Sequence, residues 1–117
     1  MKLKITVHST IKEVQDAFSK VYPALKIEFY KKGHPENRLS DKRYKINSEG
    51  AGALQTIFSK KALVDINKNM IVAEFEKNFF ETFGIAAQIF RRSGNIWLQT
   101  SKTDDWTLEK QNAQGAS

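Results

Sequence analysis

Hydrophobic and polar residues alternate over residues 2–7 and again over residues 26–32. An apolar side chain at every second position is typical of a strand that is buried on one face. Between these segments, Thr10 and Glu13 have the spacing of a capping box, and Pro23 ends the helix that the box begins. The apolar positions of that helix recur at helical spacing and are Ile11, Val14, Phe18, Val21 and Tyr22. The first part of the chain therefore predicts a strand, a helix and a second strand.

The same order of patterns returns after residue 62. Residues 63–66 predict a strand. An apolar helix face follows, formed by Val72, Phe75, Phe79 and Phe83. Gly84 stands where a C-terminal helix cap belongs, and residues 85–92 predict another strand. Ser93-Gly94-Asn95 then turns the chain into a hairpin partner over residues 96–100.

The two units align at an offset of 61 residues without a gap. Matched positions include Leu3 with Val64, Phe18 with Phe79, Phe29 with Phe90, and Gly33 with Gly94. The alignment predicts an internal repeat, although any two amphipathic units of this kind share part of the pattern. Neither unit closes a core alone, and right-handed crossovers are strongly preferred.

Two such units predict an α+β fold of the ferredoxin-like β-α-β-β-α-β type. Two helices would cover one face of a mainly antiparallel sheet, and the strand over 96–100 would extend one edge as a C-terminal hairpin strand. We expect a single domain over residues 1–110, with halves 1–33 and 62–100. A long loop over 34–61 would join the halves, and residues 111–117 would form a frayed tail.

Composition narrows the class of protein. A chain of 117 residues corresponds to about one domain. The absence of cysteine excludes disulfides and thiolate chemistry. No apolar run approaches the roughly 20 residues of a spanning helix, and no apolar signal segment follows the N-terminus, so we expect a cytoplasmic protein with no membrane partner. The net charge is +6, and residues 1–68 hold 14 Lys and Arg against 7 Asp and Glu. This excess favours anionic partners, or is simply a lysine-rich surface that keeps the protein soluble.

No residue pattern has the spacing of a catalytic or metal site. His8 and His34 do not belong to a ligand-spaced pair, and both are expected in exposed turns. The segment 50–52 lacks the further glycines or lysine of a nucleotide-binding loop. Asp104 and Asp105 read as the acidic start of a short helix. The sequence therefore predicts a protein that is not an enzyme and holds no cofactor or metal.

A basic and aromatic cluster is the strongest candidate for binding. The segments 29–33 and 90–94 end matching strands. The first combines two aromatic residues with two cations, and the second combines one aromatic residue with two cations. Alternation predicts that Phe29 and Phe90 point inward. The possible binding face comprises Tyr30, Lys31, Lys32, Arg91, Arg92 and Trp97. Such a face can stack bases and contact phosphates, but these residues are also ordinary strand formers and edge charges that prevent aggregation.

The C-terminal third carries a resemblance. It reads Phe90-Arg91-Arg92-Ser93-Gly94-Asn95-Ile96-Trp97-Leu98-Gln99-Thr100, then Thr103-Asp104-Asp105-Trp106-Thr107-Leu108 and Gln111-Asn112. This segment resembles the closing signature of a small family of uncharacterised bacterial proteins. The resemblance implies a bacterial, cytosolic origin. It implies no activity and no functional residue.

Three functional hypotheses follow. The first is a non-enzymatic interaction module that binds a protein partner, or itself as a homo-oligomer, through the sheet face, the hairpin edge or the long loop. The alternative is a nucleic-acid-binding module that uses the basic and aromatic face and binds single strands in a salt-sensitive way. A third is a ligand pocket under the loop over 33–61.

The segment from Trp106 onward can also fold back over the open sheet face beside Trp97 and occupy it.

Overall fold

The chain forms both strand–helix–strand units that its pattern predicts. The computed structural model describes residues 1–32 and 39–117. The elements are β1 (Lys2–Ile5), α1 (Ile11–Val21), β2 (Leu25–Tyr30), β3 (Ala62–Asp65), α2 (Val72–Phe83), β4 (Ala86–Ser93), β5 (Ile96–Gln99) and α3 (Leu108–Ala116). Three short 3-10 helices are η1 (Lys42–Tyr44), η2 (Gly50–Leu54) and η3 (Ser101–Thr103). The predicted turn after β2, with His34, and the basic residue Arg38 lie outside the described residues.

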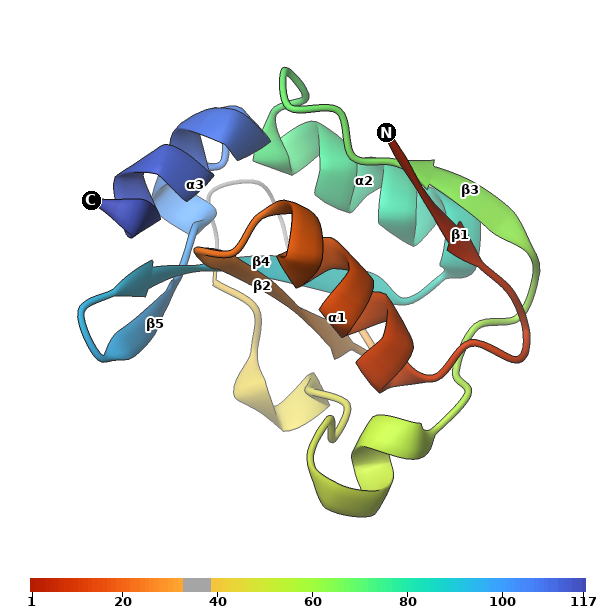
Figure 1. The fold of residues 1–117 in the computed structure, drawn as a ribbon. Helices are drawn as coiled ribbons and strands as arrows, with labels where there is room; N and C mark the ends of the chain where they lie inside the picture. The colour runs from red at the N-terminus through yellow and green to blue at the C-terminus, as the bar shows by residue number, and fades with distance from the viewer. Residues whose placement is uncertain (33–38) are drawn as a thin grey trace.

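The described strands pair into two separate antiparallel sheets. β1 pairs with β3, and β4 lies between β2 and β5. The β1–β3 ribbon and the β4–β5 hairpin lie at opposite ends of the molecule (Figure 1). The predicted α+β class is confirmed, but the ferredoxin-like arrangement is not. In that arrangement the strands of both halves share one sheet, whereas here β1 and β2 lie in different sheets that α1 connects.

The helices cover one face of the three-stranded sheet. The ring of Phe29 on β2 stacks on that of Phe79 on α2, with centroids 5.5 Å apart. Phe18 on α1 contacts Phe75 on α2, with centroids 5.8 Å apart. Phe18 and Phe79 therefore belong to a single core, as predicted. The Tyr22 hydroxyl connects the end of α1 to the β1–β3 ribbon, because it donates a 2.6 Å hydrogen bond to the carbonyl of Ile66, the residue after β3.

The capping box begins α1 as the sequence predicts. The Thr10 hydroxyl accepts from the Glu13 amide at 3.1 Å, and the Glu13 carboxylate accepts from the Thr10 amide at 3.0 Å. These reciprocal bonds hold the pKa of Glu13 below its ordinary value. The second helix ends at Gly84, whose φ of +69° is the left-handed cap expected there.

The alignment at an offset of 61 residues matches the faces of β1 and β3 but not those of β2 and β4. In the β1–β3 pair, partners such as Leu3 and Val64 are an odd number of residues apart, so residues 61 apart share a face. In the β2–β4 pair, partners such as Ile27 and Ile89 are an even number of residues apart, so residues 61 apart lie on opposite faces. A shift by one residue moves every side chain of a strand to the other face. The gap-free alignment therefore assigns the faces of β4 incorrectly.

The C-terminal residues form a packed helix rather than the expected frayed tail. The side-chain amide of Gln111 donates to the backbone carbonyl of Thr103 at 2.7 Å, and the side-chain oxygen of Asn112 accepts from the Ala24 backbone amide at 2.8 Å. A Cβ at Gly115 would lie 2.9 Å from the Arg91 side chain, so α3 packs closely on the sheet. These contacts lie on the helix-covered face. The segment from Trp106 onward therefore does not cover the open face beside Trp97.

The described part of the long loop closes the outer edge of β2. Ile46 donates its amide to the Phe29 carbonyl at 2.8 Å, and Lys31 donates to the Tyr44 carbonyl at 2.8 Å. Further along, Phe58 enters the core. Side chains of α1 occupy the two remaining outward carbonyls of β2. Ser19 donates to that of Leu25 at 2.9 Å, and Gln15 donates to that of Ile27 at 2.8 Å.

Candidate functional site

The six residues of the predicted binding face do not share one face. Tyr30 is only 1% exposed, and burial, followed by the charge of Glu28, raises the pKa of its hydroxyl to about 12. Lys31 and Lys32 are exposed beyond the end of β2. Arg91 pairs in register with Leu25 and lies on the helix-covered face, whereas Arg92 and Trp97 lie on the opposite face.

Arg91 and its neighbours attach α3 to the sheet. The Arg91 guanidinium donates to the Gln111 side chain at 2.8 Å and lies 5.4 Å from the centre of the Trp106 ring. The ammonium of Lys110 lies 4.2 Å from the centre of the same ring. Such cation–π contacts contribute about 1 kcal/mol each when partly buried. Arg91 therefore joins α3 to β4 and is not available as part of the open face.

The open face carries a cluster that the gap-free alignment missed. The ammonium of Lys26 on β2 lies 5.3 Å from the ring centre of Phe90 and 5.2 Å from that of Trp97. The prediction that Phe90 points inward is wrong, because Phe90 pairs with Lys26 and Gln99 and shares the open face with them. Arg92 stands beside Trp97 on that face and is exposed. Lys26 occupies both aromatic rings, so neither is a free surface for stacking a base.

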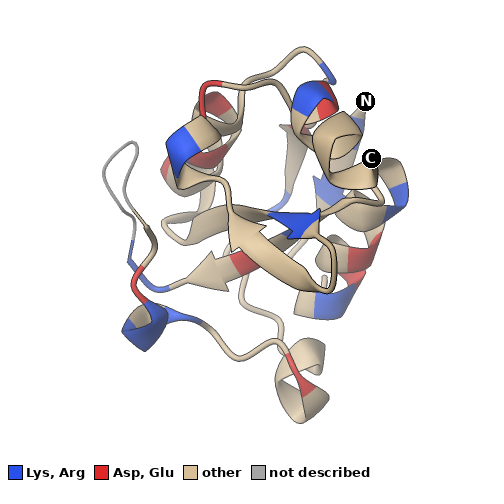
Figure 2. Cartoon of the chain, turned by 90° about the vertical axis from the view of Figure 1, so that its left-hand side faces the viewer, with Lys and Arg blue, Asp and Glu red and all other residues tan. Residues whose placement is uncertain are grey.

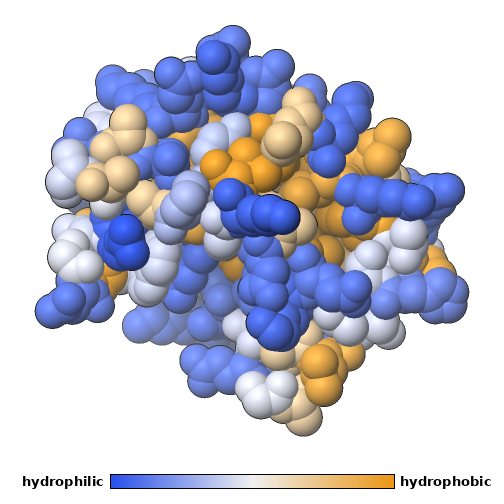
Figure 3. All heavy atoms as spheres, viewed as in Figure 1, coloured by the Kyte–Doolittle hydropathy of each residue, from blue (hydrophilic) through white to orange (hydrophobic). Residues whose placement is uncertain are grey.

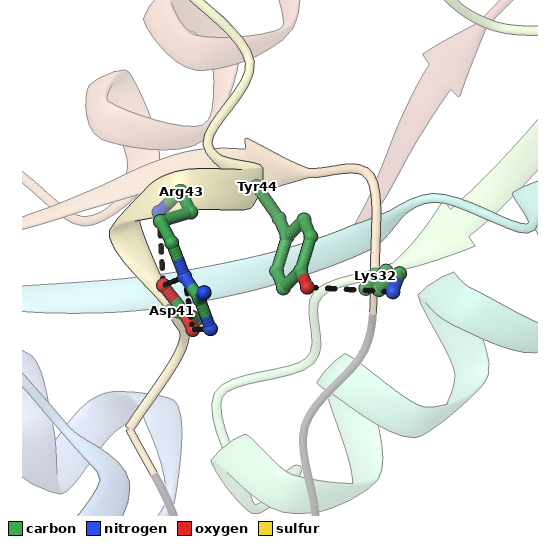
Figure 4. Close-up of polar contacts among 4 residues, drawn as sticks. All are labelled: Lys32, Asp41, Arg43 and Tyr44. Carbon is green, nitrogen blue, oxygen red and sulfur yellow. Dashed lines mark hydrogen bonds and ion pairs between the residues drawn. The ribbon is translucent and has the colours of Figure 1, made fainter.

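A second exposed group of cations surrounds Tyr44 of η1 (Figure 4). The ammonium of Lys32 lies 4.4 Å from the centre of the Tyr44 ring and 3.4 Å from its hydroxyl oxygen. Arg43 pairs with Asp41 at 2.7 Å, and its hydrogen bonds hold the pKa of that carboxyl below its ordinary range. Lys45 pairs with the buried Glu28 at 3.1 Å. The exposed Arg43–Asp41 pair contributes little to stability, and both pairs neutralise part of the positive charge of the loop.

The free edge of β5 is the most accessible binding feature of the sheet. Directly opposite residues of antiparallel strands alternate between bonded and non-bonded pairs. The Thr100 amide bonds to the Ile89 carbonyl at 3.2 Å, and Leu98 and Ile96 follow in the same alternation. The backbone N–H and C=O groups of Trp97 and Gln99 therefore point away from β4. Within residues 1–32 and 39–117, no backbone hydrogen bond reaches them.

Three consecutive apolar side chains stand along this edge. Ile96 is 59% exposed, Trp97 37% and Leu98 39%. Ile96 and Leu98 lie on the α3 side of the strand, and Trp97 lies on the open side. Exposed single apolar residues are common on protein surfaces, but a contiguous group along the outer edge of a sheet is a candidate for an interaction site.

Amide hydrogen exchange checks this backbone pattern directly. We expect the amides of Trp97 and Gln99 to exchange at least about tenfold faster than that of Leu98, because only the Leu98 amide bonds to β4. Residue-resolved exchange by NMR measures the three rates. Slow exchange at Trp97 and Gln99 in the free protein would mean that the edge is already occupied.

Buried polar residues join α2, β4 and η3 beneath the sheet edge. The Glu76 carboxylate accepts from the Ile89 amide at 2.9 Å. Burial raises the pKa of Glu76 to about 8, the Ile89 hydrogen bond lowers it, and the nearby charge of Asp104 raises it further. The Asp104 carbonyl accepts from the Ala73 amide at 2.7 Å. Both side chains are buried, so they connect elements of the fold rather than face a ligand.

An open, mostly apolar hollow lies where α1, β1 and β3 meet. Its volume is about 350 Å³, and its lining is Met1, Val21, Tyr22, Ile66, Asn67 and Lys68. Figure 3 shows apolar side chains gathered over this part of the molecule. The hollow is not the predicted pocket under the loop over 34–61. In the part of the chain that the structure describes, no group of three or more His, Asp or Glu side chains could hold a metal ion.

Comparisons with known proteins add no family to this geometry. The chain has no significant match among protein-family models, curated proteins or solved structures. The resemblance of the C-terminal segment therefore stays a prediction. Among the described residues, no helix has both the length and the apolar character needed to cross a membrane.

Proposed function

We propose that the protein is a non-enzymatic interaction module that binds an extended protein segment along β5. The segment would belong to another protein or to a second copy of this chain, and it would add one strand to the sheet. The observation that carries this proposal is the backbone edge at Trp97 and Gln99, to which no other described strand pairs. Main-chain hydrogen bonds supply the affinity in strand addition, and alternate side chains supply the specificity.

The contrast between the two edges of the sheet supports this choice. At β2, the outward carbonyls accept bonds from Ser19, Gln15 and Ile46, so no partner strand can pair there. At β5, no backbone bond from the described residues reaches the outward groups, which lie between exposed apolar side chains. A soluble protein usually shields such an edge with charges, proline or a covering segment. An edge left open beside a closed one favours a role in binding.

The nucleic-acid alternative has less support. Its six residues are divided between a buried position, the helix-covered face and the open face, and Lys26 lies over the one exposed ring among them. Lys31, Lys32 and Arg92 are exposed cations, but they do not frame a free aromatic ring. Cytoplasmic location, bacterial origin and an internal repeat also remain predictions from the sequence.

Substitution at Gln99 tests the proposed edge. Gln99→Pro removes one outward N–H without removing a bond to β4, and proline is tolerated on edge strands. We expect the wild-type protein to bind a subset of immobilised random-sequence peptides, or to self-associate in light scattering, and Gln99→Pro to lose that binding. Gln99→Ala is the matched control, because it loses the same side-chain contacts to Ser40 but keeps the N–H. Equal binding by all three proteins would remove the proposal.

A further inference from the structure

We infer that the occupant of β5 is an extended segment of a different protein in which apolar and acidic residues alternate. This inference rests on the proposed strand addition and names the chemistry of the partner. It follows from the charge around the edge and from the different character of its two faces.

The hairpin has no acidic residue. Between Glu81 and Asp104 the chain contains Arg91, Arg92 and Lys102 and no carboxylate. Figure 2 shows the β4–β5 hairpin without acidic colouring and with basic residues on β4. Of the cations around the hairpin, two lie on the open face beside Trp97, because Arg92 pairs with Trp97 and the Lys26 ammonium lies 5.2 Å from the centre of its ring. A side chain added opposite Trp97 therefore meets two cations and no carboxylate of the hairpin, which favours acidic partners and disfavours basic ones.

The two faces of β5 select different side chains. A residue of the added strand that lies opposite Trp97 shares the open face with Arg92 and Lys26, since directly paired residues share a face. Arg92 is on β4, and the added strand would lie on the other side of β5, two strand spacings or about 10 Å away. The long side chain of Arg92 can reach across Trp97 toward the added residue. The next residue faces the α3 side, where Ile96 and Leu98 are exposed. Acidic residues fit the first face, and apolar residues fit the second.

A second copy of the chain is the less suitable occupant. Each copy carries a net charge of +6, so association through β5 brings two positive molecules together. In such a pair, the strand added to β5 would be another β5, whose residues Ile96–Gln99 contain no carboxylate. The cations beside Trp97 would gain no counter-charge from it.

Labelled peptides of defined pattern test the inference. The probes are capped Val-Glu, Val-Ser and Val-Lys repeats, and binding is measured by fluorescence anisotropy at low salt. We expect the Val-Glu repeat to bind tightest and the Val-Lys repeat weakest. Arg92→Glu should weaken binding of the Val-Glu repeat about three- to tenfold, because it replaces an attraction by a repulsion. Lys60→Glu makes the same change in net charge in the segment before β3, away from the hairpin, and should leave binding within about twofold.

The outcomes separate this inference from the proposed function. If the repeats bind equally and Gln99→Pro abolishes binding, β5 adds a strand but does not select acid, and the inference is wrong. If no peptide binds and light scattering shows a dimer that Gln99→Pro dissociates, the occupant is a second copy. If no peptide binds and the protein is a monomer, both proposals fail. Circular dichroism of each variant confirms that it remains folded.

Discussion

Phe79→Ala should lower the free energy of unfolding by about 3–5 kcal/mol, the largest single-residue effect that we expect in this protein. Phe79 is fully buried in the centre of the core. Its ring contacts those of Phe29, Phe58, Phe75 and Phe83. These neighbours belong to β2, to the segment before β3 and to α2 itself, so they cannot all move inward to fill the space. Equilibrium denaturation with urea measures the loss.

Phe80→Ala is the matched control on the same helix. Phe80 is 42% exposed and has the same side chain, so its truncation creates no enclosed cavity. We expect a loss of less than about 1 kcal/mol. Similar losses for Phe79→Ala and Phe80→Ala would contradict a single core closed by the inward face of α2.

Stability should fall as pH rises, because Glu76 is buried in its protonated form. Its pKa is about 8 in the folded protein against an ordinary value of 4.5. Between these values the unfolded chain binds fewer protons than the folded one. The contribution of Glu76 is therefore fully present below the ordinary pKa and is lost as pH rises through the folded pKa. The free energy of unfolding should decrease on the order of 1 kcal/mol per pH unit in this window.

Glu76→Gln isolates this effect, since the amide resembles the protonated acid and can still accept from the Ile89 amide. We expect the variant to match the wild type at the acidic end of the window and to be more stable at the alkaline end, in urea denaturation across that range. Glu74→Gln removes an exposed carboxylate from the same helix and should retain the wild-type slope. An unchanged slope in Glu76→Gln would mean that another group titrates.

The sequence predicts the elements well because their signals are local. The capping box of α1, the glycine cap at Gly84 and the apolar stripes of both helices depend on neighbours within a few residues, and each lies where predicted. The turn between Ser93 and Ile96 likewise fixes the β4–β5 hairpin. The candidate edge strand could therefore be found without coordinates.

Strand partners and side-chain faces require non-local information. The helix α1 ends at Tyr22, with φ −124° and ψ 82°, before Pro23, whereas α2 ends in the left-handed Gly84. The two ends direct the following strands differently, and the faces of β4 are exchanged relative to the alignment. Ala86, Ala87 and Gln88 are buried in succession, on both faces of β4. The first half of β4 therefore lacks the alternation of apolar and polar residues that would show which face points to the core. Phe90 and Arg91 were consequently assigned to the wrong sides.

The closure of the β2 edge limits how far the molecule can assemble. A sheet with two open edges can join copies end to end and grow into a filament. Here Ser19, Gln15 and Ile46 cover one end of the three-stranded sheet. Copies of this chain could therefore join only through β5, which would give a dimer closed at both outer edges instead of a polymer.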